Sequence, residues 1–225
     1  MHLTSAPTPD SSPDTKSRLL EAAGQVFAEV GFKAATIREI CQRASANVAA
    51  VNYHFGDKEG LYRAVLDFSA NCALEKYPIG GGELPELCAK DRLRVFIRTY
   101  LSRLLDEGRP AWHGKLIARE MMEPTQALAI LADTFARPQY HRLRGIISEL
   151  LGPAASAEDL RRCAASIVGQ CIFYKQCRPM IQVLMPEQGY DEASLGVLAG
   201  HIFEFSIGAI ESIRMARAAS KGAAS

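Results

Sequence analysis

Apolar residues recur at steps of three and four along almost the whole chain, which is the period of an amphipathic α-helix. The clearest stripe lies near the amino end and consists of Leu19, Leu20, Ala23, Val26, Phe27 and Val30. No stretch of useful length alternates apolar and polar residues as a half-buried strand does. Hydrophobic residues make up 48% of the 225 residues, and charged residues 23%, as in folded globular proteins. We therefore expect an all-α fold.

The amino-terminal helices are marked by end signals. The first follows Ser12 and Pro13, a capping residue and a first-turn proline, and ends at Gly31. The second begins at Thr36, because Thr36-x-x-Glu39 is the spacing of a capping box. The remaining signals are Asn47 as the cap of a third helix, Gly56 as its end, and Asp57 as the cap of a fourth.

A loop rich in glycine and proline is expected at 77–85. Helices are expected after it near 91–107, 111–122, 125–151, 157–176 and 191–217, which gives about nine helices in total. Pro138 should kink or interrupt the helix at 125–151, because proline cannot donate the backbone hydrogen bond.

The segment at 35–55 predicts two short helices joined by a tight turn, a shape that lets the second helix enter the major groove of DNA. At 100° per residue, Val48, Val51 and Phe55 share one side of this helix and are expected to face the protein. The expected outward set is Ala49, Ala50, Tyr53 and His54, with Asn52 at the border. Small outward side chains would let the backbone approach DNA closely. A plain three-helix unit with a partly apolar exterior is the alternative.

Charge around this segment is only weakly positive. The stretch at 33–63 carries a net charge of +2, and the whole chain carries +1. The charged residues of the stretch are Lys33, Arg38, Arg43, Lys58 and Arg63 against Glu39, Asp57 and Glu59. Composition alone therefore neither favours nor excludes nucleic acid as a partner.

Four motifs resemble the amino-terminal domain of TetR-family transcriptional repressors: RLLEAA at 18–23, FAEVGF at 27–32, TIREI at 36–40 and YHFGDKEGLY at 53–62. Two later segments, REMMEPT at 119–125 and GQCIFY at 169–174, look like the CecR/AefR-like subgroup. Residues 1–13 are rich in Pro, Ser and Thr and are expected to form a flexible tail. The resemblance implies a helix-turn-helix DNA-binding domain at 14–62 and a helical ligand-binding and dimerisation domain at 63–225.

The resemblance implies phosphate contacts from Thr36 and Lys58, and a contact of Arg38 with the DNA backbone or a groove edge. Thr36 has the alternative of acting as a helix cap only. The turn at 45–47 (SAN) lacks the glycine that is common in the family, so its geometry is expected to differ.

The same resemblance implies that Ala49, Ala50 and Asn52 face bases, and that Tyr53 and His54 hold phosphates. Asn52 has the alternative of contacting a phosphate or a water molecule. His54 has the alternative of an ordinary surface residue at the end of the helix.

Two late helices are too apolar to have a single buried side. No charged residue lies at 163–174, and Glu204 is the only one at 193–210. One apolar stripe of the last helix consists of Leu198, Ile202, Phe205, Ala209 and Ile213, and another of Phe203, Ile207 and Ile210. Since one stripe needs a partner, and Gly196, Gly200 and Gly208 permit close contact, we expect a homodimer through two helices of each subunit. A single-chain bundle that buries both stripes is the alternative.

Polar residues within the apolar runs of the middle helices offer an aromatic wall, a cation and hydrogen-bonding groups. Such a set suits a small amphipathic or anionic effector. The residues are Trp112, His113, Arg119, Glu120, Gln170, Cys171 and Tyr174. The family implies the pocket, and each residue has the alternative of a satisfied core group or a surface residue.

The sequence therefore predicts a ligand-responsive transcriptional repressor that binds a near-palindromic DNA operator as a homodimer. Its subgroup implies transport or efflux genes as targets. The alternative is a helical small-molecule-binding or interaction scaffold that does not bind DNA specifically. An enzyme is not expected, because no known catalytic spacing joins His113, Glu120, Cys171 and His201.

No metal site and no cofactor are expected. The six cysteines, none of them two residues from another, are expected to be reduced structural thiols. The amino end has neither the basic nor the apolar region of a secretory signal, so we expect a cytoplasmic protein. No run approaches the ~18–20 apolar residues that cross a bilayer, so no membrane association is expected.

Overall fold

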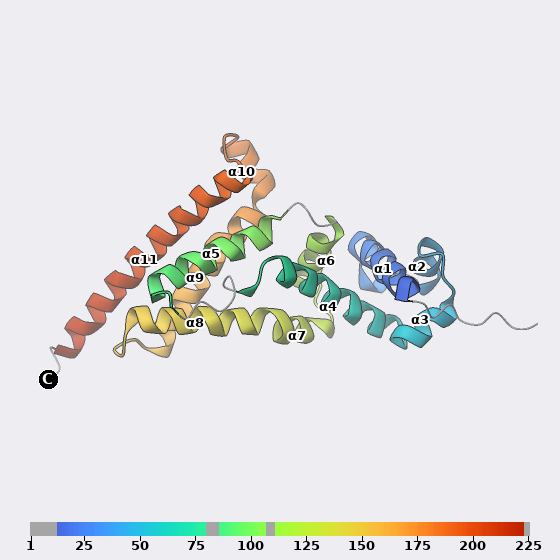
Figure 1. The fold of residues 1–225 in the computed structure, drawn as a ribbon, viewed down its shortest axis with the longest axis horizontal. Helices are drawn as coiled ribbons and strands as arrows, with labels where there is room; N and C mark the ends of the chain where they lie inside the picture. The colour runs from blue at the N-terminus through green and yellow to red at the C-terminus, as the bar shows by residue number, and fades with distance from the viewer. Residues whose placement is uncertain (1–12, 80–85, 107–110, 223–225) are drawn as a thin grey trace, which may run out of the picture. The chain divides into compact units, whose positions relative to one another are not determined.

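The computed structural model describes residues 13–79, 86–106 and 111–222, and all regular structure in these ranges is helical (Figure 1). The all-α prediction is therefore confirmed. Most of the predicted tail at 1–13 and the centre of the predicted loop at 77–85 lie outside the described residues. The chain forms two compact units, with boundaries at 72/73, 106/107 and 134/135. We call residues up to 72 together with 107–134 the amino-terminal unit, and the remainder the carboxy-terminal unit.

The amino-terminal unit consists of α1 (Pro13–Ala34), α2 (Ile37–Arg43), α3 (Val48–Phe55), most of α4 (Lys58–Lys76), α6 (Ala111–Met122) and α7 (Ala127–Leu131). Its core is a continuous apolar cluster to which α1, α2, α3, α4 and α6 all contribute. Leu19, Phe27, Ile40 and Val51 are fully buried in it. The region at 107–134, which the sequence assigns to the ligand-binding part, is thus packed with the helix-turn-helix; the functional boundary after residue 62 stays a prediction.

Most of the predicted end signals of α1 to α4 are found in the structure; Ser12 lies outside the described residues, and the Glu39 half of the predicted capping box is not formed. Gly31 has φ 80°, so the regular run of α1 breaks there. The Thr36 hydroxyl caps α2 by accepting the Glu39 N–H, and the Glu39 carboxylate pairs with Arg43. The caps and stop that follow are also present: Asn47 accepts the Ala50 N–H, Gly56 has φ 80°, and Asp57 accepts the Gly60 N–H.

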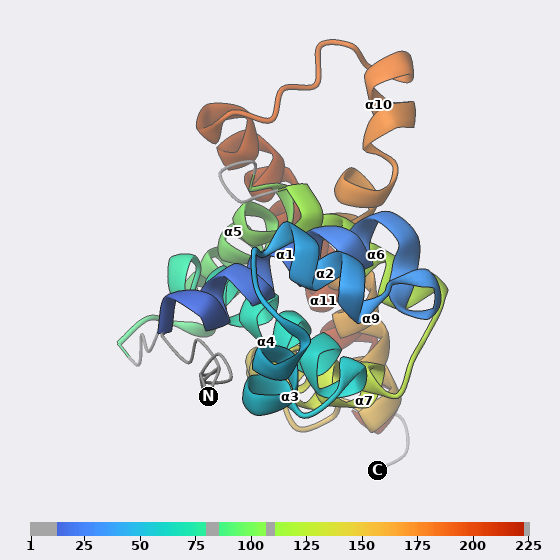
Figure 2. The same cartoon turned by 90° about the vertical axis from the view of Figure 1, so that its right-hand side faces the viewer.

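Helix α6 lies against α1 (Figure 2). The Trp112 ring lies over Gly24, where an added Cβ would be 2.5 Å from ring atoms, and its indole N–H donates to Glu21 over 2.7 Å. The fit needs a residue without a side chain at position 24, because there is no room for another carbon atom.

The carboxy-terminal unit consists of α5 (Ala89–Leu105), α8 (Arg137–Leu151), α9 (Ala157–Gln176), α10 (Arg178–Leu184) and α11 (Glu192–Gly222), with the end of α4. Its core is built from α5, α8, α9 and α11, and includes Leu101, Leu143, Cys171 and Ile202. Figure 2 shows α10 joined to α11 by an extended segment.

Two helical regions differ from the sequence prediction. The helix expected at 125–151, with a kink or interruption at Pro138, is divided into α7, a π-helical turn at Ala132–Ala136, and α8, so the interruption lies just ahead of Pro138, which is in the first turn of α8. Proline is tolerated there because the first N–H groups of a helix have no partner within it. Helix α10 was not predicted at all, so the described chain has more helices than the nine expected.

Helix α11 also corrects the expectation about apolar runs. By length and composition, Glu192–Ser220 could cross a membrane. In the structure, Leu198, Ile202 and Ile210 of this helix are buried in the core of the carboxy-terminal unit. A core helix of a folded domain meets the same two criteria, so they carry little weight here.

Candidate nucleic-acid interface

Helix α2 places two of the expected DNA contacts at its exposed start. The Thr36 hydroxyl accepts the Glu39 N–H over 3.2 Å and still has its own proton to donate. Arg38 is exposed and forms no ion pair with the other described residues. Both side chains are therefore available to phosphate oxygens.

Helix α3 does not present quite the face that its periodicity predicts. Ala50 is 1% exposed, so the prediction that it points outward to a base is wrong. Val48, predicted to face inward, is 49% exposed. The buried face is centred on Ala50 and Val51, because these two residues pack in the core of the amino-terminal unit. Ala49 and Asn52 are exposed, as predicted.

The last turn of α3 carries an exposed tyrosine beside a half-buried histidine. Tyr53 is 67% exposed, and its ring meets the His54 ring edge-on, with 5.0 Å between centroids. The His54 Nε2 atom is buried and has no hydrogen-bond partner among the described residues. The Tyr53 side chain is thus exposed enough to reach a phosphate, whereas the Nε2 atom of His54 is not.

Lys58 is held at the start of α4 by contacts within the unit. Its ammonium lies 4.8 Å from the centre of the Phe32 ring and donates to the Lys33 carbonyl over 3.3 Å. Burial lowers its pKa from the ordinary value for lysine. These contacts fix the position of the charge at the amino end of α4.

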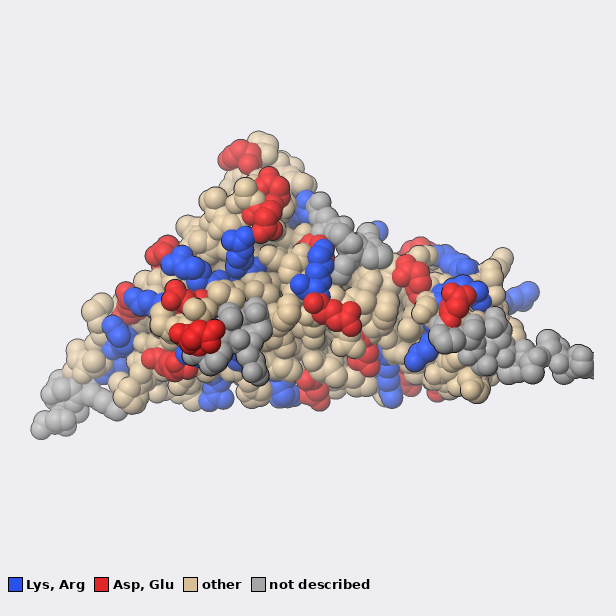
Figure 3. Space-filling model, viewed as in Figure 1, with Lys and Arg blue, Asp and Glu red and all other residues tan. Residues whose placement is uncertain are grey.

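Ion pairs use up part of the positive charge near the helix-turn-helix. Arg43 pairs with Glu29 and Glu39, both over 2.8 Å, and Arg63 pairs with Glu59 over 2.9 Å. The face of this unit seen in Figure 3 accordingly shows acidic and basic side chains side by side. Of the five basic residues at 33–63, Lys33, Arg38 and Lys58 form no ion pair within the described chain.

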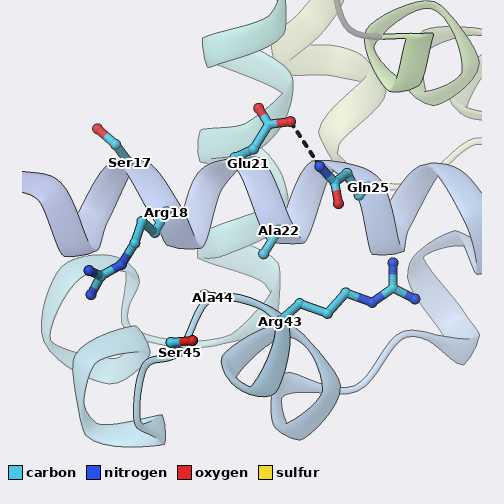
Figure 4. Close-up of a pocket in the computed structure, with 8 residues that line it drawn as sticks. All are labelled: Ser17, Arg18, Glu21, Ala22, Gln25, Arg43, Ala44 and Ser45. Carbon is cyan, nitrogen blue, oxygen red and sulfur yellow. Dashed lines mark hydrogen bonds between the residues drawn. The ribbon is translucent and has the colours of Figure 1, made fainter.

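A shallow groove runs between α1 and the turn that joins α2 to α3 (Figure 4). Arg18 pairs with Asp14 over 2.8 Å, and the Gln25 amide donates to Glu21 over 3.0 Å. Because Arg43 is paired as well, the charged groups of this groove already have partners. The remaining lining residues are Ser17, Ala22, Ala44 and Ser45.

The four predicted effector residues of α6 make structural contacts inside the amino-terminal unit. Trp112 is seated on α1 as described above, and the His113 ring hydrogen-bonds Ser69 over 3.0 Å. Arg119 donates to the Glu29 carbonyl over 3.2 Å and covers Gly31.

Glu120 is the most enclosed of these residues, with no exposed surface. Its carboxylate accepts the Tyr62 hydroxyl over 2.6 Å, and both the N–H and the hydroxyl of Thr125, over 2.8 and 3.0 Å. Burial and the adjacent Glu120 carboxylate raise the pKa of Tyr62. The carboxylate therefore joins α6 to α4 through a buried hydrogen bond.

The other three predicted effector residues lie on α9, in the carboxy-terminal unit. Cys171 is fully buried, and burial raises its pKa to about 12, so the thiol is protonated at neutral pH. The Gln170 amide donates to Ser206 over 3.3 Å, and Tyr174 packs on the core. The seven residues are thus divided between the two units, and their role in binding an effector stays a prediction.

Val48 is the exposed residue that the sequence did not predict for the interface. Helical period gives the angles between residues but not the rotation of the helix about its axis. The signal that could have indicated the exposure of Val48 is its position directly after the Asn47 cap, at the end of a short helix. No cluster of His, Cys, Asp and Glu suited to a metal ion occurs among the described residues.

Two family comparisons cover most of the chain. Residues 19–65 match the bacterial regulatory proteins of the tetR family, and residues 89–210 match the C-terminal domain of the HTH-type transcriptional dual regulator CecR. The chain belongs to the TetR family. It is a DNA-binding transcriptional regulator with a CecR-type carboxy-terminal domain, and the family is not enzymatic.

Similar proteins agree with this assignment. The dual regulator CecR of Shigella flexneri is 28% identical over 185 residues, covering 79% of this chain and 82% of that protein. A tetR-family regulatory protein from Rhodococcus RHA1 has a TM-score of 0.64 at 22% identity, covering 88% of this chain and 98% of that one. The flavonoid-responsive regulator FrrA has a TM-score of 0.60 at 17% identity, covering 88% and 97%. The solved structures support the same fold.

Proposed function

We propose that this TetR-family regulator is a cytoplasmic repressor that binds a near-palindromic operator as a homodimer and is released by a small-molecule effector. The observation that carries the proposal is the exposed polar set on the helix-turn-helix. Asn52 and Tyr53 project from α3, and Thr36 and Arg38 stand exposed at the start of α2. By subgroup resemblance, the proposed targets are transport or efflux genes.

Each exposed side chain has a proposed role on DNA. Asn52 is suited to a base edge, because its amide offers both a donor and an acceptor, as adenine requires. Thr36, Arg38 and Lys58 are suited to phosphates, which fix the position of α3 in the groove. Tyr53 adds a hydroxyl contact to the backbone.

An exposed apolar face on α9 and α11 supports the homodimer. Ile172 and Phe173 of α9 are exposed, and so are Val197 and Phe205 of α11, the last to 64%. An added Cβ at Gly208 would meet nothing within 4 Å, so its surface is open to another helix. A two-fold axis through such a face would duplicate the reading helix and explain a palindromic operator.

We further propose that an effector favours the conformer that does not bind DNA. The name of the fold neighbour FrrA describes a response to a small molecule, and the Shigella relative is named a dual regulator. To reverse the two conformers from 1:99 to 99:1, an effector needs about 5.5 kcal/mol of differential affinity. Repression is tested by placing the selected operator in a promoter fused to a reporter, where deletion of the regulator should raise expression.

DNA binding is tested by selecting sequences from a random duplex pool and measuring affinity by fluorescence anisotropy. The variants Tyr53→Ala and Arg38→Ala should each weaken binding about tenfold. This is roughly the effect of losing one hydroxyl or charge-assisted contact in each half-site. Tyr140→Ala, which removes an exposed tyrosine of α8, is the matched control and should bind as the parent does. A folded protein that enriches no sequence would support the scaffold alternative instead.

The homodimer is tested by sedimentation at micromolar concentration. Phe205→Lys should shift the protein to the monomer without unfolding it, because the side chain is mostly exposed within one subunit. Tyr140→Lys introduces the same charge on α8 and should remain dimeric. A parent protein that sediments as a monomer would remove the dimer from the proposal.

A further inference from the structure

The exposed side chains in the first turn of α3 are apolar. Val48 is 49% exposed and Ala49 is exposed, whereas Ala50 and Val51 are buried. The Asn47 side chain is engaged as the helix cap, with its oxygen 2.8 Å from the Ala50 N–H. The first outward hydrogen-bonding side chain after the cap is Asn52, one turn further along. This turn therefore cannot distinguish bases by side-chain hydrogen bonds beyond the cap.

A major groove offers one apolar mark, the C5-methyl group of thymine. Valine suits this mark because its χ1 angle is nearly fixed within a helix, so its two methyl groups are held in place before binding. Contact with a methyl group also removes the exposed valine surface from water. The carbon side chains of Val48 and Ala49 thus match thymine better than any other base edge.

We propose that Val48, assisted by Ala49, is a specificity-determining residue that selects thymine through its methyl group. This inference rests on the proposed function, since it requires α3 to enter the groove. It adds a residue that recognises a base by apolar contact, one turn before Asn52. Helical period alone placed Val48 on the inward side and so did not suggest this role.

The experiment uses the full-length protein and the operator selected from the random pool. Each thymine is replaced in turn by deoxyuridine, which removes the methyl group and keeps every hydrogen-bonding atom. At the position read by Val48, one missing methyl should weaken binding about fourfold, and both half-sites together about fifteenfold. In Val48→Ala, binding to the thymine operator should fall, and deoxyuridine at that position should have little further effect.

Val30→Ala is the matched control, because Val30 is an exposed valine of α1 with 41% exposure. It should keep the deoxyuridine profile of the parent. Val48→Ala should remain folded, since alanine favours a helix more than valine does, and circular dichroism checks this.

Two results would overturn the inference. An enriched operator whose deoxyuridine profile is flat, or is the same in the parent and in Val48→Ala, removes the role of Val48 and leaves the proposed function standing. A folded protein that enriches no sequence removes both.

Discussion

At the scale of single residues, the buried carboxylate of Glu120 has the most consequences. It accepts three hydrogen bonds, from Tyr62 and from the N–H and hydroxyl of Thr125, with no exposure to water. When a buried acceptor loses a donor, the free-energy cost of removing it from water is no longer offset by a hydrogen bond. The contact between α4 and α6 therefore depends on each of these donors.

Tyr62→Phe removes one donor and little volume. We expect it to lower the free energy of unfolding by about 1–3 kcal/mol, the usual cost of an unmade buried hydrogen bond. Urea denaturation measures this, with Tyr140→Phe on the exposed side of α8 as the control. Equal stability of the two variants would show that the Tyr62 hydroxyl contributes nothing.

Ser45 lies in the turn at 45–47, where a glycine is common in the family, and its backbone has φ 49°. A side chain in this left-handed region costs about 1–2 kcal/mol. Glycine removes this cost, but it loses more conformational entropy on folding, which offsets part of the gain. Ser45→Gly should therefore stabilise the protein by about 0.5–1 kcal/mol. Thermal unfolding measures it, and Ser45→Ala, which keeps the strain, should not stabilise; a gain in both variants would point to the lost hydroxyl instead.

At the scale of helices, α6 is fitted to α1 at the site where Trp112 covers Gly24. Gly24→Ala would place a methyl group 2.5 Å from the indole ring, so we expect a loss of about 1–3 kcal/mol from overpacking. Gly145→Ala is the control, because nothing lies within 4 Å of its Cβ and alanine favours the helix. Chemical denaturation should show a lower free energy of unfolding for Gly24→Ala and a higher one for Gly145→Ala.

Arg217, near the end of α11, donates two hydrogen bonds of 3.0 and 2.7 Å to Asp159, near the start of α9. These bonds join the two helices. The Arg217 guanidinium, together with hydrogen bonds from Ser156, holds the pKa of Asp159 well below its usual range. A carboxyl with a lowered folded pKa stabilises the protein above its unfolded pKa of about 3.9, and this contribution is lost as the pH falls through the folded pKa.

The melting temperature of Asp159→Asn should therefore lie furthest below that of the parent at neutral pH, and the gap should narrow below about pH 4. Melting curves from pH 7 to pH 2 measure this, with the exposed Glu187→Gln as the control. A gap that is independent of pH would contradict the assignment of the charge.

The helix ends were predictable because their signals are local. Thr36, Asn47, Gly56 and Asp57 act on backbone groups within four residues, and all four were found in place. Helix α10 was not predicted, because it is only seven residues long and buries only Ile181, so no amphipathic stripe marks it. An interruption of 125–151 was predicted from Pro138, but its form, a π-helical turn ahead of the proline, was not.

The site was predictable in part. Outward Ala49, Asn52 and Tyr53 follow from helical period, but the rotation of α3 that buries Ala50 and exposes Val48 is set by its packing. The Tyr62–Glu120 hydrogen bond joins residues 58 positions apart, and no spacing in the sequence indicates it.

At the scale of the whole molecule, the salt dependence of DNA binding depends on the basic residues at 33–63, of which three form no ion pair within the described chain. Lys33, Arg38 and Lys58 of each subunit give about six phosphate contacts in a dimer, so log affinity against log salt should have a slope of about −5. Anisotropy titrations from 50 to 300 mM KCl measure it, with Lys33→Gln expected to reduce the slope by about 2. A slope near −10 would mean that further cations contact the backbone.

The chain passes between its two units three times, at 72/73, 106/107 and 134/135. The DNA-binding end is consequently not a portable amino-terminal module. A chimaera cut after residue 62 would leave behind the indole that fills the space over Gly24 and the carboxylate that receives the Tyr62 hydroxyl. Engineers who wish to give this operator specificity to another sensor would have to transplant two separate pieces of sequence, and evolution faces the same constraint on shuffling it.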